Sequence, residues 1–560
     1  MTTIPDAAQK VPMMFRAQIN GRCQLQRLVP RADEQHAERW ADEWIDKTYP
    51  VAPEFSGGVQ SRIYQLSWRF VTNGGQDDGV IRPVIGAKGW PFYPGSSMKG
   101  VFRQACDARQ AERYCGGEDE LTPGILRFHG GYPTDESWTD ALVDIVHPQQ
   151  DRQVKQEGRS SAFIQISLYK PELKFGISST IPLSTEEWET IWKIWDNAIA
   201  SGLGCRVSAG YGQPQQQSGE VIYYTQLKGQ GQAAKLLDES GEFRPNIFRA
   251  AIRGHALRIF GGLTNASNAE DLVDTLFGGI RRRDAKVGLL SMAFQTDEAR
   301  SEMDTFGRGN YAQPTYEVEG KLLWMLTRPL PDTERTALTK LIEALTRFAM
   351  VLGGFGKSWR RADHRLVYPD YYEDDYKALI GCHWEWLGKR SQVRDARFRK
   401  LEKFGDFITE VQTAAQDWMQ LQNVQPNPAQ HADWREAWHP SKVQVWGRLT
   451  DKSGDIEDCQ AVHWLHGPYR QAIPTAGIRE GSIYKSSLTG QMGQIGRLWH
   501  RMYPYIRLVK DPENPKRPKP LVTRQYFELL TLFPDDEPET LDFLDFLNNQ
   551  QQSFQKLWPE

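Results

Sequence analysis

The segment WPFYPGSSMKGVFRQAC, residues 90–106, joins a Pro-Gly-Ser-Ser turn directly to a stretch with helical spacing. Turn residues of this kind fix a loop, and the helix that follows begins with backbone N–H groups that have no partner inside the helix. Lys99 and Arg103 are four residues apart, so they share one helical face. Oriented amides, a positive helix end and two cations suit a phosphate group. An ordinary loop-to-helix junction with solvated charges is the alternative interpretation.

Strand and helix patterns alternate along the first half of the chain. RIYQLSWRF (62–70) and SAFIQISLY (161–169) place apolar side chains at every second position, which predicts half-buried strands. Apolar residues then recur at helical spacing over 185–200, where Ser184 and Glu187 form a capping box. A chain that mixes strands and helices without regular alternation indicates the α+β class.

Two predicted helices run into glycine-rich loops. The helix at 185–200 is followed by SGLGCRVSAGYGQ (201–213), and a second helix, over 338–352, is followed by GGFGKSWRRADHR (353–365). Backbone amides and arginines in such loops contact phosphates. A C-capping loop between a helix and a strand is the alternative for each loop taken alone.

The opening segment also has a counterpart later in the chain. PNIFRAAIRGHALRIF (245–260) places an Arg-Gly pair where the first copy has Lys-Gly. Gly100 and Gly204 are 104 residues apart, and Gly254 and Gly356 are 102 apart. Two ordered features at nearly equal separation predict two tandem units of about 150 residues, a period longer than that of solenoid repeats.

These features predict three regions within 560 residues. The first unit covers residues 1–220 and the second covers 221–375. The third region, 376–560, contains only a fragment of the pattern, the YKSSLTG stretch at 484–490, and too few residues follow it for a complete unit with its own glycine loop.

Composition narrows the function classes. A net charge of −3 argues against indiscriminate nucleic-acid binding but allows a local basic groove. The six cysteines are scattered without a CxxC pair, which is typical of reduced thiols in a cytoplasmic protein. The N-terminus has no signal-peptide pattern, and no run approaches the roughly 18 apolar residues of a membrane span.

Paired carboxylates lie shortly before the phosphate-binding segment. Asp77 and Asp78, in GGQDDGVIRP, could hold Mg²⁺ or act as a base on a ribose hydroxyl. An Asp-Asp-Gly turn is the alternative. Asp238 is the nearest analogue in the second unit, although its spacing is shorter by six residues. A Walker loop at 354–358 is disfavoured because position 351 is Val, where the pattern needs Gly.

GWPFYPGSSMKGVFR in unit one, IRGHALRIFGG with LFGGI (276–280) in unit two, and the two glycine loops together resemble the RAMP superfamily of CRISPR-associated proteins. More narrowly, the chain resembles the tandem backbone subunits, similar to the seventh Cas family, of type III (Csm and Cmr) RNA-guided effector complexes. The resemblance covers roughly residues 10–375.

The resemblance implies tandem ferredoxin-like (RRM-like) domains with a C-terminal extension. It implies CRISPR guide RNA, target single-stranded RNA and other Cas subunits as partners, in a cytoplasmic ribonucleoprotein complex without membrane contact that serves antiviral defence. A hairpin thumb, for which 147–160 is the candidate, would kink the guide–target duplex. The residues expected to contact RNA are Ser96, Ser97, Lys99, Arg103, Gly202, Gly204, Arg206, Arg253, His255, Arg258, Gly354, Gly356, Lys357, Arg360 and Arg361.

Family members that cut target RNA use an Asp in the loop before the turn, which here falls on Asp77 or Asp78. The resemblance thus implies a metal-dependent endoribonuclease with Mg²⁺ on these carboxylates, and Asp238 as the candidate in unit two. Unit two has Phe-Arg-Ala-Ala in place of Pro-Gly-Ser-Ser, which departs from the pattern. The alternatives are a non-catalytic guide-RNA scaffold, a guide-processing endoribonuclease that acts through a His, and an assembly protein that never touches RNA.

Overall fold

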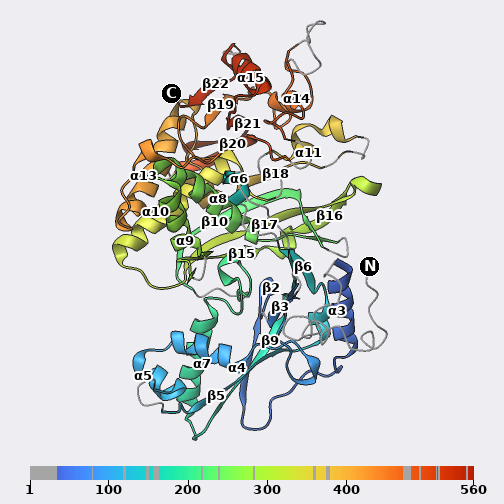
Figure 1. Ribbon diagram of the computed structural model, residues 1–560, viewed down its shortest axis with the longest axis vertical. Helices are drawn as coiled ribbons and strands as arrows, with labels where there is room; N and C mark the ends of the chain where they lie inside the picture. Colours follow the sequence, from blue (N-terminus) through green and yellow to red (C-terminus); the bar gives the residue numbers. More distant parts are fainter. Residues whose placement is uncertain are drawn as a thin grey trace, which may run out of the picture.

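The computed structural model describes residues 34–560 apart from short gaps. The gaps are at residues 73, 78–79, 118–121, 147–150, 156–162, 216–218, 237–239, 282–283, 357–360, 374–376, 378, 471–480, 491–493, 513, 515–517, 550–552 and 560. Figure 1 shows an elongated molecule in which the chain starts in a lower lobe, continues through a central layer and ends at the opposite pole.

The lower lobe is built on a small antiparallel sheet. Its elements are β1 (Gln60–Gln65), α4 (Gly95–Gln104), β5 (Leu126–Pro133), β9 (Glu172–Ser179) and α7 (Thr185–Ile199). The strand order is β1-β9-β5, and a bridge between Leu66 and Pro214 adds a rudimentary fourth strand beside β1. The unit therefore follows a βαββαβ path in which the order across the sheet is fourth, first, third, second.

The central unit repeats this path with longer elements. They are β10 (Val221–Gln232), α8 (Asn246–Leu263), β15 (Leu290–Thr296), β17 (Gln313–Leu326), α10 (Asp332–Leu352) and β18 (Cys382–Trp386). The sheet order β18-β10-β17-β15 is again fourth, first, third, second, with antiparallel neighbours. Because β18 completes this sheet, unit two extends to residue 386, beyond the boundary at 375 that the sequence predicted.

The C-terminal region forms a third sheet of the same order. Its elements are β19 (Gln444–Leu449), α14 (Ala461–His466), β20 (Leu498–Lys510), β21 (Pro518–Leu532), α15 (Pro538–Asn549) and β22 (Gln555–Trp558). The order β20-β21-β19-β22 is antiparallel throughout. The sequence predicted only fragments of a unit here, because the first helix has just six residues and no glycine-rich loop marks the second.

The predicted helices follow from their local sequence. Ser184 accepts a hydrogen bond from the Glu187 backbone N–H at 3.2 Å, so α7 begins where the capping pattern placed it. α10 ends at Leu352, directly before the second glycine loop. The mixture of helices and sheets confirms the α+β prediction.

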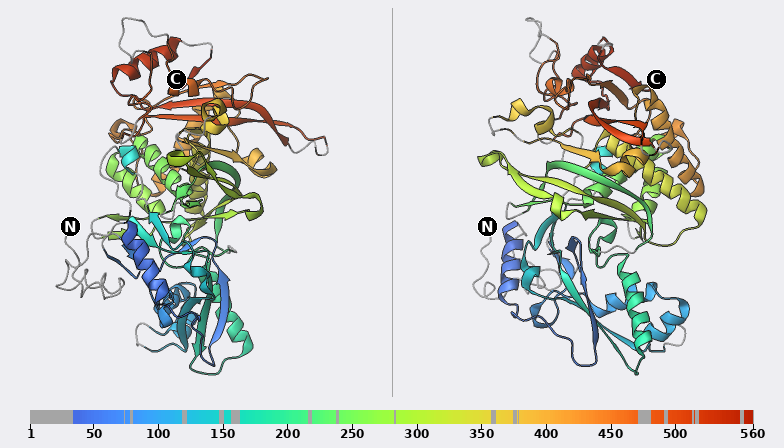
Figure 2. Two further views of the ribbon diagram at one scale, coloured as in Figure 1. Left: turned by 90° about the vertical axis from the view of Figure 1, so that its right-hand side faces the viewer. Right: turned by 180° about the vertical axis from the view of Figure 1, so that it is seen from behind.

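The second and third units share one hydrophobic core. The ring of Trp438 lies 5.4 Å from that of Trp558 and 6.3 Å from that of Trp499, and all three side chains are buried. α13 (Phe404–Leu421) packs against α10 and continues the same core. α10 contacts both β10 of the second sheet and β20 of the third, so helices of unit two lie between the two sheets. Figure 2 shows unit three at the pole opposite the lower lobe, which has a separate core.

A buried ion pair joins the lower lobe to unit two. Nε of Arg69 donates to Oε1 of Glu242 at 2.9 Å, and Nε1 of Trp68 donates to the same oxygen at 3.2 Å. Asp144 adds a second carboxylate 3.6 Å from Arg69, whose side chain is fully buried. Since removing one partner would leave a charge without compensation away from water, this contact holds the two units together.

Candidate nucleic-acid interface

The first turn of α4 presents the polar residues of the Pro-Gly-Ser-Ser-Met-Lys motif to solvent. Met98 and Phe102 are fully buried and lie four residues apart, so they fasten one face of the helix to the sheet. Ser96, Ser97 and Lys99 fall on the opposite side and are exposed. Pro94 is the N-cap residue, and its side chain has no acceptor for the first amides of the helix. The exposed turn therefore offers hydroxyls, an ammonium group and the N–H groups of a helix start.

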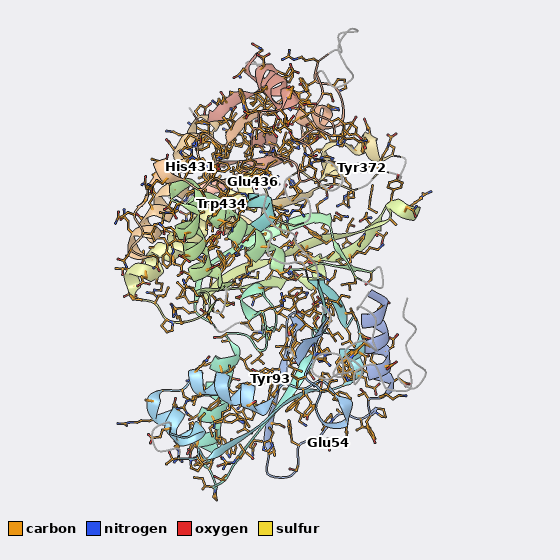
Figure 3. All side chains as sticks on the ribbon, viewed as in Figure 1. Glu54, Tyr93, Tyr372, His431, Trp434 and Glu436 are labelled. Carbon is orange, nitrogen blue, oxygen red and sulfur yellow. The ribbon has the colours of Figure 1, made fainter. Side chains whose placement is uncertain are left out.

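The first glycine loop adjoins this turn. Burial raises the pKa of Tyr93 to about 12, and a hydrogen bond with the Gly204 backbone opposes part of that rise. Tyr93, labelled in Figure 3, directly precedes the motif, so the loop and the helix start meet through it. Gly204 is exposed and has φ +78°, and a Cβ there would lie 2.2 Å from the Val71 carbonyl oxygen. Only glycine fits this position. Gly202 (φ +88°) is buried below it.

The arginines of unit one are partly engaged. Nη1 of Arg103 donates to the Gly116 carbonyl at 2.7 Å and is half-buried, so it holds the turn behind α4. Arg206 is half-buried, follows Gly204 closely and has the left-handed φ of 61°. Burial, then the charges of Arg253 and Arg206, lower the pKa of Arg249 to about 10. The structure thus brings Arg206 and Arg253, predicted from separate units, to one junction.

The cations predicted in unit two lie inside the protein. Arg253 forms ion pairs with Asp151 and, at 3.8 Å, with Asp274, and its side chain is 11% exposed. His255 is fully buried between the rings of Phe348 and Trp499. This packing keeps a nucleic acid from reaching His255.

Arg258 is likewise part of the core. Its Nε donates to Oε2 of Glu436 at 2.9 Å, with both side chains at 1% exposure or less, and its guanidinium lies 4.9 Å from the centre of the Trp499 ring. The prediction that His255 and Arg258 contact RNA is therefore wrong, because both side chains pack in the core. The four-residue helical spacing that suggested a cationic face does not distinguish an exposed face from a buried one.

The second glycine loop is a packed turn. Gly354 (φ +73°) and Gly356 (φ +105°) flank Phe355, which is fully buried and accepts a hydrogen bond from Nε1 of Trp384 at 2.7 Å. Arg361 donates to the Thr489 carbonyl of unit three, and burial lowers the pKa of its guanidinium. Lys357 and Arg360 lie outside the described residues.

The candidate carboxylates fall largely outside the described part of the chain. Asp78 and Asp238 lie outside it, and only the backbone of Asp77 is described: it pairs with Val80 in the hairpin of β3 (Gly75–Asp77) and β4 (Val80–Arg82). The predicted Mg²⁺ site therefore stays a prediction. Val84, just beyond this hairpin, accepts a backbone hydrogen bond from Phe92 at 2.9 Å, so the hairpin and the motif of α4 are neighbours.

The described part of the predicted thumb, α6 (Asp151–Lys155), packs against α8 of unit two and against residues 435–436 of the C-terminal region. Val154 is 1% exposed and belongs to the core that units two and three share. Its carbonyl accepts from the Glu436 backbone N–H at 3.1 Å, and Arg435 donates to the Gln153 carbonyl at 2.6 Å. Figure 1 shows α6 beside α8, although its chain neighbours belong to the lower lobe. A lone valine in the polar stretch DRQVKQE was the one sequence signal for this contact.

The comparisons with known proteins give a weak likeness to a solved structure. No family model matches the chain, and no curated protein is similar to it. A chain of the solved structure described as "Cryo-EM structure of the Type III-B Cmr-beta bound to cognate target RNA" shares 18% identity over 36% of this chain and 69% of its own length, with a TM-score of 0.23. A TM-score at this level does not establish a common fold. No helix among the described residues has the length and apolar character needed to cross a bilayer.

Proposed function

We propose that this protein is an RNA-binding backbone subunit of a type III CRISPR effector complex, built from tandem ferredoxin-like units. The observation that carries the proposal is the exposed first turn of α4, with Ser96, Ser97 and Lys99 in solvent beside the exposed Gly204. The motif resemblance of the same residues to RAMP proteins adds to it. The βαββαβ order of the sheets supports the ferredoxin-like part.

The guide strand is proposed to cross unit one only. Its phosphates would meet the α4 turn and Gly204 and continue toward Arg206 at the junction with unit two. Contacts to phosphates carry no sequence information, so one surface can hold any guide, and base pairing selects the target. Unit two, in which the predicted cations Arg253 and Arg258 are ion-paired and largely buried, and unit three would support unit one and contact other Cas subunits.

Target cleavage is proposed at Asp77 and Asp78. The hairpin that contains Asp77 precedes α4, and Val84, just after this hairpin, accepts a backbone hydrogen bond from Phe92, just before the α4 motif. Oxygen ligands of this type suit Mg²⁺, which would stabilise charge on the phosphate while a carboxylate accepts the proton of a ribose 2′-hydroxyl. A subunit that holds guide RNA but does not cleave target RNA is the competing function.

Binding of single-stranded RNA by the Lys99→Ala variant tests the RNA contact. Each phosphate contact on single-stranded RNA contributes about 0.7 to the slope of log K against log salt. Lys99→Ala should therefore lower that slope by about 0.7 and weaken binding equally for unrelated sequences. Lys340→Ala is the matched control, because Lys340 is also exposed but lies on α10 of unit two. Equal binding by the wild type and Lys99→Ala would remove the proposed interface.

A further inference from the structure

A buried Cys-His-Glu cluster lies in unit three, away from the proposed RNA surface. Among the residues that the structure describes, one group of three metal-ligating side chains brings its donor atoms together: Cys459, His500 and Glu528, all buried. Cys459 lies just before α14, His500 on β20 and Glu528 on β21. Three separate elements thus converge on one point between the sheet and the helix that covers it.

The spacing of the donor atoms fits a small cation. Sγ of Cys459 lies 3.4 Å from Nε2 of His500 and 3.0 Å from Oε1 of Glu528, and Nε2 lies 3.3 Å from Oε1. Donors bound to a tetrahedral zinc ion at 2.0–2.3 Å are about 3.3–3.6 Å apart. An ion would sit about 1 Å above the plane of the three atoms. Only the Sγ–Oε1 distance must lengthen, by about half an ångström.

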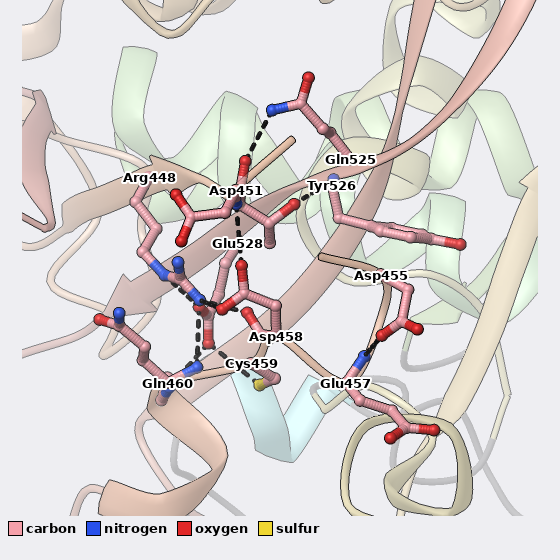
Figure 4. A network of polar contacts seen from close by, with 12 residues as sticks. Arg448, Asp451, Asp455, Glu457, Asp458, Cys459, Gln460, Gln525, Tyr526 and Glu528 are labelled. Carbon is pink, nitrogen blue, oxygen red and sulfur yellow. Dashed lines mark hydrogen bonds and ion pairs between the residues drawn. The ribbon is translucent and has the colours of Figure 1, made fainter. Parts of the chain in front are cut away.

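The surroundings orient the carboxylate. Nε of Arg448 donates to Oε2 of Glu528 at 2.6 Å, and the Gln460 N–H donates to the same atom at 3.1 Å, as Figure 4 shows. These contacts direct Oε1 toward the thiol and the imidazole. Groups that orient a ligand in this way are a regular feature of protein metal sites.

The donor atoms of the cluster share one acceptor. Oε1 of Glu528 lies within hydrogen-bond distance of Cys459 Sγ, His500 Nε2 and the Ala461 backbone N–H, the last at 2.7 Å. A bound ion would replace the contacts of the thiol and the imidazole with Oε1.

We propose that Cys459, His500 and Glu528 form a structural Zn²⁺ site, with water as the fourth ligand. Binding of one Zn²⁺ releases the thiol proton to solvent and moves the imidazole proton from Nε2 to Nδ1. Thiolate, imidazole and carboxylate are the ligand types that zinc takes. Because all three side chains are buried, the ion would fasten α14 to β20 and β21.

The metal content of the purified full-length chain tests this proposal. We expect about one Zn²⁺ per chain in the wild type and in Cys382→Ala, which removes a buried thiol outside the cluster. Cys459→Ala and His500→Ala should each hold less than a tenth of that. Retention of zinc by Cys459→Ala would overturn the assignment, because the ion would then lie elsewhere.

If those variants fail to fold, a spectroscopic measurement on the wild-type chain tests whether the cluster binds a metal ion. The wild-type chain, stripped and reloaded with Co²⁺, should show the near-ultraviolet charge-transfer band of one thiolate bond and the visible bands of a tetrahedral ion. Cys382→Ala should show the same spectrum. A wild-type chain with neither zinc nor a thiolate–cobalt band would show that the cluster is a hydrogen-bonded anchor only.

Discussion

The substitution Arg258→Met separates a core role from an RNA-binding role at one residue. The Arg258 guanidinium and the Glu436 carboxylate are within 2.9 Å, and their side chains are 1% and 0% exposed. Removal of the arginine leaves Glu436 in the core with Arg435, whose Nη2 lies 2.6 Å from its other oxygen. Breaking a buried ion pair costs about 3–5 kcal/mol. Because Arg435 remains, we expect the lower end, about 3 kcal/mol.

That loss is large enough to measure by thermal unfolding. Units two and three share one core and together have about 340 residues, so at about 2.1 cal/mol/K of unfolding entropy per residue their melting temperature should fall by about 4 °C. Tryptophan fluorescence can follow the transition, because Trp438 and Trp499 lie in the same core. RNA affinity, measured below the transition, should stay at the wild-type value.

A second variant controls for lost packing. In Arg258→Met with Glu436→Leu, no uncompensated carboxylate remains, and apolar replacements of buried ion pairs are often neutral. More than half of the lost stability should return. An unchanged melting temperature in Arg258→Met, together with weaker RNA binding, would refute the placement of this arginine in the core.

Three further predictions concern other parts of the molecule. Burial and the charge of Arg361 lower the pKa of His466 to about 4. Burial also holds the pKa of its hydrogen-bonded partner His364 well below 6.5. Below pH 6.5 the unfolded chain therefore binds more protons than the folded chain. Stability should therefore fall as the pH drops from about 6.5 toward 4, and His466→Gln should make that slope shallower in melts recorded across this range; an identical slope would contradict the burial of this pair. Gly204→Ala should destabilise unit one by about 2 kcal/mol or more, because φ is +78° and the new Cβ would meet the Val71 carbonyl. Gly57→Ala, where a Cβ meets nothing within 4 Å, is its control in urea unfolding, and equal midpoints would count against the strained loop. Asp77→Ala with Asp78→Ala should abolish cutting of target RNA by a reconstituted complex while leaving guide binding intact, and undiminished cutting would exclude both carboxylates from the chemistry.

Local patterns in the sequence predicted local structure well. Ser184 and Glu187 marked the start of α7, and the glycine loops lie where their spacing placed them. The repeat was recognisable because each loop follows a long helix with a strong apolar period. These signals work from the sequence because capping, helical periodicity and positive φ angles depend on neighbouring residues.

Long-range packing could not be predicted from these local sequence patterns. Arg258 and Lys99 have the same local context, a cation next to or near a glycine on a helix, yet one is buried with Glu436 and the other is exposed. The partner of Arg258 lies 178 residues away. The third βαββαβ sheet escaped prediction for a related reason, since α14 is short and β20 and β21 form one long hairpin without the glycine landmarks of units one and two.

Ultraviolet crosslinking of bound RNA, followed by peptide mapping, tests the central claim most directly. The account predicts crosslinks in the peptides that contain Ser96–Lys99 and Gly204–Arg206, which line the exposed surface of unit one. Peptides that contain His255 and Arg258 should carry none, because those side chains lie in the core. Crosslinks confined to unit two or unit three, with the α4 peptide unmodified, would contradict the proposal that unit one holds the RNA.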